Sequence, residues 1–321
     1  PMKLSKLSAA TIIALSIPLI ASAQQFPVKP ITVIIPASPG GGTDTFGRKI
    51  AEEAQNLLNQ PLIVENRGGG SGTIGLGQVT RAKPDGYTVG FVWNSPLTSV
   101  PHSLNVPYKN TDYSALMSIG FSSYVICAAP NFPANNGKEL IELIRANPEK
   151  YTIGNDGVGG TMQLASERIF SKAGVKVRQI PFKGAGDTAK NFLGGHIDLY
   201  GGSITAIQPH VNAGKAKCLL LTSAEKNSAL PQASSLTDIG MPGEETVLWW
   251  GLVVPADTPQ AIKDQLETTF MKAASTASMK EAMAKQGAVN RPRGAVDTNK
   301  LIASEYAALE QVAKSIGLEK K

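Results

Sequence analysis

The residues best suited to chemistry form a glycine-rich segment close to the start of the chain. Ile31–Glu53 reads ITVIIPASPGGGTDTFGRKIAEE, with three glycines at Gly40–Gly42 and a helix expected to open near Thr43 and Asp44. A strand, a glycine turn and a helix start direct free backbone N–H groups and a positive dipole end at one point. Such a point favours an anion, and a carboxylate fits as well as a phosphate because the loop has no lysine. The same pattern is also typical of a tight turn with a capped helix.

The same order of strand, glycine loop and helix recurs further along the chain. Tyr151–Phe170 repeats it, with four glycines ahead of a helix expected to open at Thr161. Gln179–Leu193 repeats it again with Asp187 as the expected cap, and Tyr200–Ser203 is a weaker version. This repetition predicts two facing α/β lobes, each of which offers helix N-termini to a ligand lying between them.

Patterns that could indicate catalysis or a cofactor are incomplete. Gly70–Gly75 matches G-x-G-x-x-G, but no acidic residue ends the next strand about 20 residues on, where a dinucleotide ribose would need one. Ser38 lacks the first glycine of a nucleophile elbow. The three histidines have no metal-ligand spacing. We therefore expect no catalytic residue, no cofactor and no metal; a secreted α/β hydrolase or transferase using Ser38 or Ser203 is the enzymatic alternative.

The first residues have the features of an export signal. Lys3 and Lys6 precede the mostly apolar run Ala9–Ile20, and Ala21-Ser22-Ala23 supplies the small-x-small pattern of a cleavage site. We predict cleavage after Ala23, which makes residues 1–23 a signal peptide and the periplasm the location of the protein. The basic residues then fall from 31 to 29 against 25 acidic ones, without a basic cluster. Nucleic acid is therefore not an expected partner, whereas small acidic ligands are.

Two cysteines, Cys127 and Cys218, lie in apolar strand-like runs. Buried free thiols are the favoured interpretation, because a free cysteine behaves as a small apolar side chain. A cross-strand disulfide is the alternative, since an exported protein meets an oxidising compartment.

The hydrophobic pattern alternates short strands with helices, which predicts mostly parallel sheets covered on both faces. A further strand at Trp249–Val254 is followed by two long helices, Pro259–Gln286 and Asp297–Ile316. In such folds ligands bind outside the carboxyl ends of the strands. The other strands are predicted at Ile31–Ile35, Pro61–Glu65, Tyr87–Trp93, Tyr124–Ala129, Tyr151–Gly154, Val177–Pro181, Ile197–Tyr200 and Lys217–Thr222, and the other helices at Asp44–Leu58, Lys138–Ala146, Thr161–Ala173, Asp187–Leu193 and Ile204–Ala213.

Four motifs follow one another along the chain and together are specific. They read PASPGGGTDTFGRKIAEE, VENRGGGSGTIGLGQVTRAKPDGYTVGFV, IPFKGAGDTAKNFLGGHIDL and WWGLVVPADTP. In this order they resemble the extracytoplasmic receptors of tripartite tricarboxylate transporters, often called Bug receptors, over Phe26–Leu318. The resemblance implies a two-lobed type II periplasmic-binding-protein (Venus flytrap) fold with mostly parallel sheets flanked by helices. It also implies capture of a small mono- or dicarboxylate by lobe closure, and its delivery to a permease of one large and one small subunit.

The resemblance also implies which residues line the cleft and where the lobes divide. Residues 24–122 with 247–321 would form lobe I and residues 123–246 lobe II, in a receptor expected to be a monomer. Three stretches, at Asn94–Leu97, Asp187 and Tyr200–Ser203, depart from the usual pattern, so the carboxylate is left unidentified. A receptor that presents its ligand to a membrane kinase is a further alternative. The ligand-binding residues that the resemblance implies are Ser38, Gly40, Gly41, Gly42, Thr43, Asp44, Asn94, Ser95, Gly159, Gly160, Thr161, Lys183, Gly184, Ala185 and Ser203.

Overall fold

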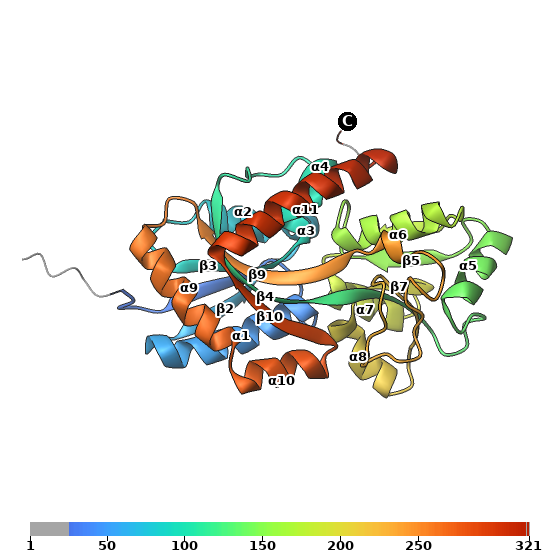
Figure 1. The fold of residues 1–321 in the computed structure, drawn as a ribbon, viewed down its shortest axis with the longest axis horizontal. Helices are drawn as coiled ribbons and strands as arrows, with labels where there is room; N and C mark the ends of the chain where they lie inside the picture. Colours follow the sequence, from blue (N-terminus) through green and yellow to red (C-terminus); the bar gives the residue numbers. More distant parts are fainter. Residues whose placement is uncertain (1–25, 319, 321) are drawn as a thin grey trace, which may run out of the picture.

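The computed structural model describes residues 26–318 and 320, and its strands form one mixed sheet that runs through two lobes (Figure 1). The strand order is β2-β1-β3-β9-β4-β7-β5-β6, and β10 and β8 each pair with β4. The strands are β1 (Ile31–Ile35), β2 (Leu62–Asn66), β3 (Thr88–Trp93), β4 (Tyr113–Ala128), β5 (Thr152–Asn155), β6 (Arg178–Pro181), β7 (Leu199–Ser203), β8 (Lys217–Leu221), β9 (Val247–Pro255) and β10 (Ala288–Gly294).

In the first lobe, β1 lies between β2 and β3 and is parallel to both. Val33 and Ile35 face helix α1 (Gly42–Leu58) and pack with Phe46, whereas Ile34 faces the other way and packs with Leu76 of α2 (Thr73–Thr80). Successive side chains of a strand point to opposite faces, so a continuous apolar run suits a strand covered on both sides.

The second lobe repeats this arrangement with β5 between β6 and β7, again parallel. Leu199 of β7 packs with the core that includes α5 (Gly137–Ala146) and α6 (Thr161–Lys172). Its neighbour Tyr200 packs on the opposite face with α7 (Ala185–Leu193) and α8 (Ile204–Asn212). The two lobes are therefore similar sandwiches of parallel strands and helices.

Long strands connect the two lobes, as the green and orange ribbons in the middle of Figure 1 show. β4 is 16 residues long and pairs antiparallel with β9 in the first lobe and with β7 and β8 in the second. The sequence predicted only Tyr124–Ala129 there, because Ser118, Gly120 and Ser122–Ser123 interrupt the apolar pattern of the preceding part. The pairs that involve these crossing strands are antiparallel, whereas the pairs of β1 with β2 and β3, and of β5 with β6 and β7, are parallel as predicted.

The C-terminal part differs in detail from the prediction of two long helices. The first of these is broken at Ser275-Thr276 into α9 (Gln260–Ala274) and α10 (Ala277–Lys285), because Thr276 Oγ1 accepts the Met279 N–H at 3.1 Å and caps α10. Strand β10 follows and was not predicted. The last helix, α11 (Ala295–Ser315), runs over the short helices α3 (Ser95–Thr98) and α4 (Val100–Ser103) toward the second lobe.

The end of α11 joins the lobes on one side of the molecule. Leu309 and Ala313 of α11 are buried together with Leu164 of α6 in a small apolar cluster. Figure 1 shows this end of the helix above α6. None of the helices in the described ranges is long and apolar enough to cross a membrane. The predicted signal peptide lies outside the described residues.

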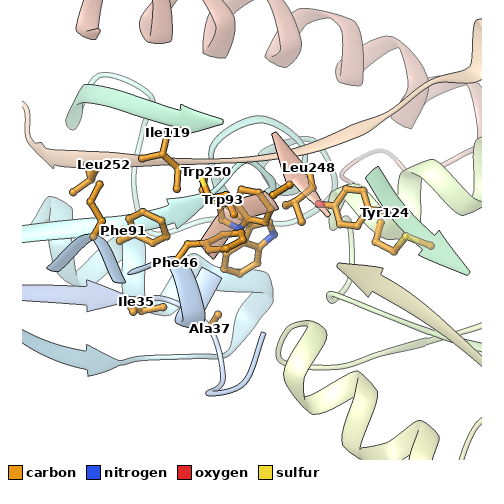
Figure 2. Close-up of a cluster of buried hydrophobic side chains, with 14 of the residues drawn as sticks. Ile35, Ala37, Phe46, Phe91, Trp93, Ile119, Tyr124, Leu248, Trp250 and Leu252 are labelled. Atoms are coloured by element: carbon orange, nitrogen blue, oxygen red, sulfur yellow. The ribbon is translucent and has the colours of Figure 1, made fainter. Parts of the chain in front are cut away.

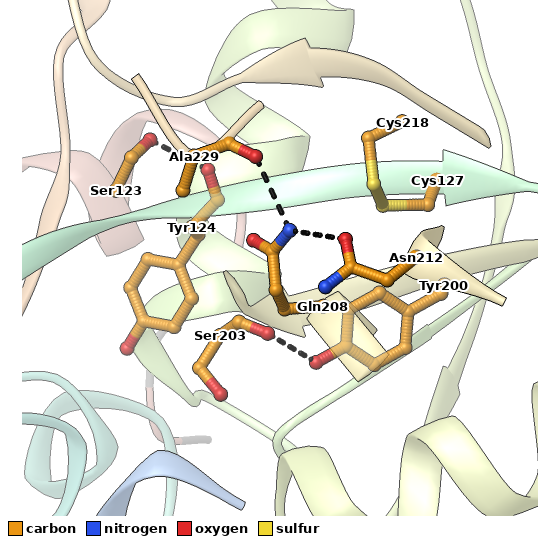
Figure 3. Close-up of a disulfide and its surroundings, with 9 residues drawn as sticks. All are labelled: Ser123, Tyr124, Cys127, Tyr200, Ser203, Gln208, Asn212, Cys218 and Ala229. Atoms are coloured by element: carbon orange, nitrogen blue, oxygen red, sulfur yellow. Dashed lines mark hydrogen bonds between the residues drawn. A yellow bond between two sulfur atoms is a disulfide. The ribbon is translucent and has the colours of Figure 1, made fainter. Parts of the chain in front are cut away.

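The two cysteines form a disulfide, so the interpretation as free thiols is wrong (Figure 3). Cys127 of β4 lies directly opposite Cys218 of β8 in the antiparallel register, and their Cα atoms are 3.9 Å apart. The register between two strands 91 residues apart in sequence decides this pairing, and the sequence alone could not supply it.

Candidate ligand-binding cleft

A small cavity lies between the two lobes, at the carboxyl ends of their parallel strands. Each lobe contributes loops that follow strands, and the crossing strands β4 and β9 contribute one residue each. The lining residues are Ala37, Ser38, Gly41, Gly42, Thr43, Trp93, Tyr124, Asp156, Gly184, Ala185, Ser203 and Leu248.

Three helices from both lobes begin at this cavity. Their N-cap residues are Gly41 for α1, Gly184 for α7 and Ser203 for α8, and none of them makes a side-chain cap hydrogen bond. The first N–H groups of a helix have no partner within the helix, and the dipole places partial positive charge there. Three such ends around one cavity create an environment for an anion without any lysine or arginine in the lining.

Glycines allow the lobes to approach closely beside these helix ends. A Cβ atom on Gly41 would lie 3.2 Å from the backbone nitrogen of Gly186 in the other lobe. A Cβ on Gly42 would lie 2.9 Å from the Trp250 ring and 3.1 Å from Thr205 Oγ1. The Gly42 N–H donates to Ser203 Oγ across the cleft at 3.4 Å. The glycines of this loop therefore allow the backbones of the two lobes to come into contact, in addition to forming a turn.

Aromatic residues hold the start of α1 in place from the first lobe. The indole N–H of Trp250 donates to Thr43 Oγ1 at 3.2 Å, and the same ring packs edge-on against Phe46 with centroids 4.8 Å apart. Figure 2 shows Trp93, Trp250 and Phe46 gathered in one cluster, with Leu248 and Tyr124 on the side toward the second lobe. Thr43 is thus oriented by a side chain of the crossing strand β9.

Asp44 faces away from the cavity, although it belongs to the glycine loop. Its carboxylate accepts the Gly40 N–H at 3.0 Å, the Arg48 Nε–H at 2.9 Å and the Asn66 Nδ2–H at 2.9 Å. Asp44 therefore stabilises the loop within its own lobe. Gly40 is exposed beside it and has a positive φ of 89°, a conformation that favours glycine.

The start of α6 makes contacts between the lobes. The Thr161 N–H donates to Ser95 Oγ at 2.6 Å, and Thr161 Oγ1 lies 3.1 Å from Ser99 Oγ. Ser95 is the first residue of α3 in the first lobe, and Ser99 is the C-cap of that helix. Ser95, Ser99 and Thr161 are fully buried. The start of α6, where Gly159, Gly160 and Thr161 are predicted to bind the ligand, therefore bonds to protein groups in this structure.

Asp156 is the ionisable carboxyl group of the cavity. It follows β5, is 2 % exposed, and accepts hydrogen bonds from the Ser95 hydroxyl at 2.7 Å and the Trp93 indole N–H at 3.2 Å. Its other oxygen accepts the Met162 N–H of α6 at 3.1 Å. Burial raises the pKa of this carboxyl, and the neutral hydrogen-bond donors counteract that effect in part.

A second buried carboxyl group supports the cleft from behind. Glu305 of α11 accepts hydrogen bonds from Asn94 Nδ2 at 2.7 Å, Thr98 Oγ1 at 2.8 Å and Trp249 Nε1 at 2.6 Å. Burial raises the pKa of Glu305 as well. Asn94 therefore faces its own lobe, and Glu305 positions the loop that bears Ser95.

The structure brings about half of the predicted ligand-binding residues to the cavity. Asp44, Asn94, Ser95 and the α6 start brace the loops or join the lobes, and Lys183 is exposed. Asp156 also lines the cavity, and its position directly after a strand was a signal that could have identified it. Nothing in the sequence indicated that Tyr124 or Leu248 would line the cavity. The predicted residues in the lining are Ser38, Gly41, Gly42, Thr43, Gly184, Ala185 and Ser203, and those outside it are Gly40, Asp44, Asn94, Ser95, Gly159, Gly160, Thr161 and Lys183.

The lining has no imidazole or amine that could act as a base toward its serines. Ser38 and Ser203 have no histidine or lysine beside them in the cavity. His102 lies against α11, where its Nε2 is 2.8 Å from the Tyr306 carbonyl oxygen. Among residues 26–318 and 320, no cluster of three or more histidine, cysteine or acidic side chains could hold a metal.

Two α/β lobes joined by crossing strands around a cavity define the class of periplasmic binding proteins, and solved structures agree. A periplasmic binding protein named BugD superposes with a TM-score of 0.87 at 28% identity, over 92% of this chain and 100% of that chain. A structure described as R. palustris Rpa4515 with adipate gives a TM-score of 0.88 at 25% identity, over the same shares. The predicted α/β two-lobed fold class is therefore confirmed.

The chain belongs to the tripartite tricarboxylate transporter family of receptors, whose family model matches residues 46–318. A relative from Cupriavidus necator, named UPF0065 protein in gbd 5'region, is 32% identical over 84% of this chain and 82% of that protein. The predicted family and the predicted class of function, a periplasmic solute-binding receptor, are thus confirmed. The family is one of receptors and not of enzymes.

Proposed function

We propose that this receptor captures a small mono- or dicarboxylate between its lobes and delivers it to a permease with one large and one small subunit. The single observation behind this proposal is that three uncapped helix N-termini, from both lobes, meet at a cavity without a basic side chain. The structure described as Rpa4515 with adipate supports a carboxylate ligand.

The proposed carboxylate is held by neutral donors. Backbone N–H groups of Thr43 and Ala185 and the hydroxyls of Ser38 and Ser203 belong to lining residues. Neutral donors at helix ends bind an anion without the desolvation cost that burying a fixed cation would bring. Asp44, Asn94, Ser95 and the start of α6 act indirectly, by bracing the loops or joining the lobes.

We propose that lobe I comprises residues 24–122 and 247–321, and lobe II residues 123–246. Ser123 of β4 pairs with Val247 of β9, so both crossing strands pass from one lobe to the other at the same level. A hinge at this level would let the lobes open and close around the ligand. We also propose that the receptor is a monomer and acts without catalysis, since its lining serines have no histidine or lysine beside them.

Calorimetry against a panel of mono- and dicarboxylates tests this function. We expect at least one acid to bind, and no binding of nucleotides or neutral sugars of similar size. Ser203→Ala removes a lining hydroxyl and should weaken binding about 3- to 10-fold, the effect of one hydrogen bond. Ser304→Ala, at an exposed position of α11, is the matched control and should bind like wild type. Binding of sugars or nucleotides in place of acids would contradict the proposal.

A further inference from the structure

Asp156 is a negative group inside a cavity whose other features favour a negative ligand. It lines the cavity together with Gly42, Gly184 and Ser203, the residues at or beside three helix starts. It is fully buried, and no arginine, lysine or histidine forms an ion pair with it among the described residues. An anionic ligand and an ionised Asp156 would therefore share one small cavity.

Two like charges in a poorly hydrated cavity repel each other strongly. The donors to Asp156 are the Trp93 indole, the Ser95 hydroxyl and the Met162 backbone N–H, all of them neutral. These three donors leave about one of the four acceptor positions of a carboxylate for a ligand. A positively charged donor on the ligand would satisfy that position and remove the repulsion at the same time.

We propose that Asp156 makes this receptor selective for a carboxylic acid that also bears a protonated amine. The inference rests on the proposed function, since the acid end of the ligand lies at the helix starts described above. The ammonium group then lies toward Asp156, so the ligand is a zwitterion whose two charges match the two ends of the cavity. Asp156 is in this sense a specificity-determining residue.

Asp156 also has a structural role, which the test must separate from selectivity. It accepts an N–H of the first turn of α6, and it joins the lobes through Ser95 and Trp93. Loss of these contacts alone would weaken the closed form, and with it the binding of every ligand by the same factor. Selectivity, by contrast, changes the ratio between two ligands that differ only in the amine.

The experiment compares matched acids by calorimetry with the full mature chain. The pairs are L-alanine and propionate, 4-aminobutyrate and butyrate, and L-aspartate and succinate. In wild type we expect the amine-bearing member of at least one pair to bind about 10-fold tighter or more. Asp156→Asn should reduce this ratio by about 10-fold, and Asp156→Ser serves where the asparagine variant does not fold. Ser95→Ala, which removes a donor to Asp156 but keeps its charge, should weaken both members alike.

The outcomes separate this inference from the proposed function. Tighter binding of the amine-free acids by wild type, or a ratio that survives both Asp156 substitutions, overturns the inference and leaves the carboxylate receptor intact. Failure of wild type to bind any acid, with or without an amine, overturns the proposed function and this inference with it.

Discussion

Gly41→Ala should weaken ligand binding while leaving the unliganded protein about as stable as before. The added Cβ would lie 3.2 Å from the Gly186 nitrogen and 3.7 Å from the Ala185 Cβ, and both residues belong to the opposite lobe. None of the three atoms nearest to this Cβ belongs to the lobe that contains Gly41. The new methyl group therefore acts on the closed state, in which the lobes meet.

The magnitude follows from this geometry. A separation of 3.2 Å is a few tenths of an ångström too short for comfortable packing, so we assign it the low end of overpacking costs, about 1 kcal/mol. Loss of closed-state stability by that amount weakens binding about 5-fold. Gly41 has φ −87° and ψ 173°, which alanine adopts without strain. Alanine is a poorer N-cap than glycine, which lowers stability, and it reduces the entropy of the unfolded chain, which raises stability. The two effects nearly cancel, within about 0.5 kcal/mol.

The assay is calorimetry with the tightest-binding acid of the panel, together with thermal unfolding of the unliganded protein. Gly243→Ala is the control, because a Cβ there meets no atom within 4 Å. Gly186→Ala should weaken binding more than Gly41→Ala, because its Cβ would collide with the Pro39 carbonyl oxygen across the cleft. Equal affinities for wild type, Gly41→Ala and Gly186→Ala would refute the view that these glycines exist for lobe closure.

Further predictions concern stability. Reduction of the Cys127–Cys218 bond, which closes a loop of 91 residues, should lower the free energy of unfolding by about 2–4 kcal/mol in urea titrations with and without reductant, and coincident titrations would contradict this. Leu309→Ala, at the α11–α6 contact, should lower the free energy of unfolding by about 2–4 kcal/mol. A substitution at an exposed position of α11 should leave that free energy unchanged. Burial raises the pKa of Glu305 above its ordinary 4.5. The contribution of Glu305 to the free energy of unfolding is therefore fully present below pH 4.5 and is lost as the pH rises through the folded-state pKa. The stability difference between wild type and Glu305→Gln should therefore shift against wild type as pH rises from about 4 to 7, and a flat difference would argue against burial as the cause.

The local architecture of both lobes could be predicted from the sequence, because it depends on neighbours along the chain. The apolar run of β1, the glycines after it and the amphipathic α1 are short-range signals, and each appears in the structure close to its predicted place. The break at Thr276 was missed because a capping threonine inside a helical pattern is a weak signal. The part of β4 before Tyr124 was missed because Ser118, Gly120 and Ser122–Ser123 are buried by partners far along the chain.

The sequence by itself predicted four strand–glycine–helix units, and three of them, which open α1, α7 and α8, begin at the cavity in the structure. Those features depend on backbone hydrogen bonding within a few residues, which residue types control directly. Only the tertiary structure decided that Asp156 and Ser95 would engage the α6 start, that Tyr124 and Leu248 would enter the cavity, and that Cys127 would meet Cys218. Such contacts join residues far apart in the chain, and the register of the crossing strands and the closure of the lobes bring them together.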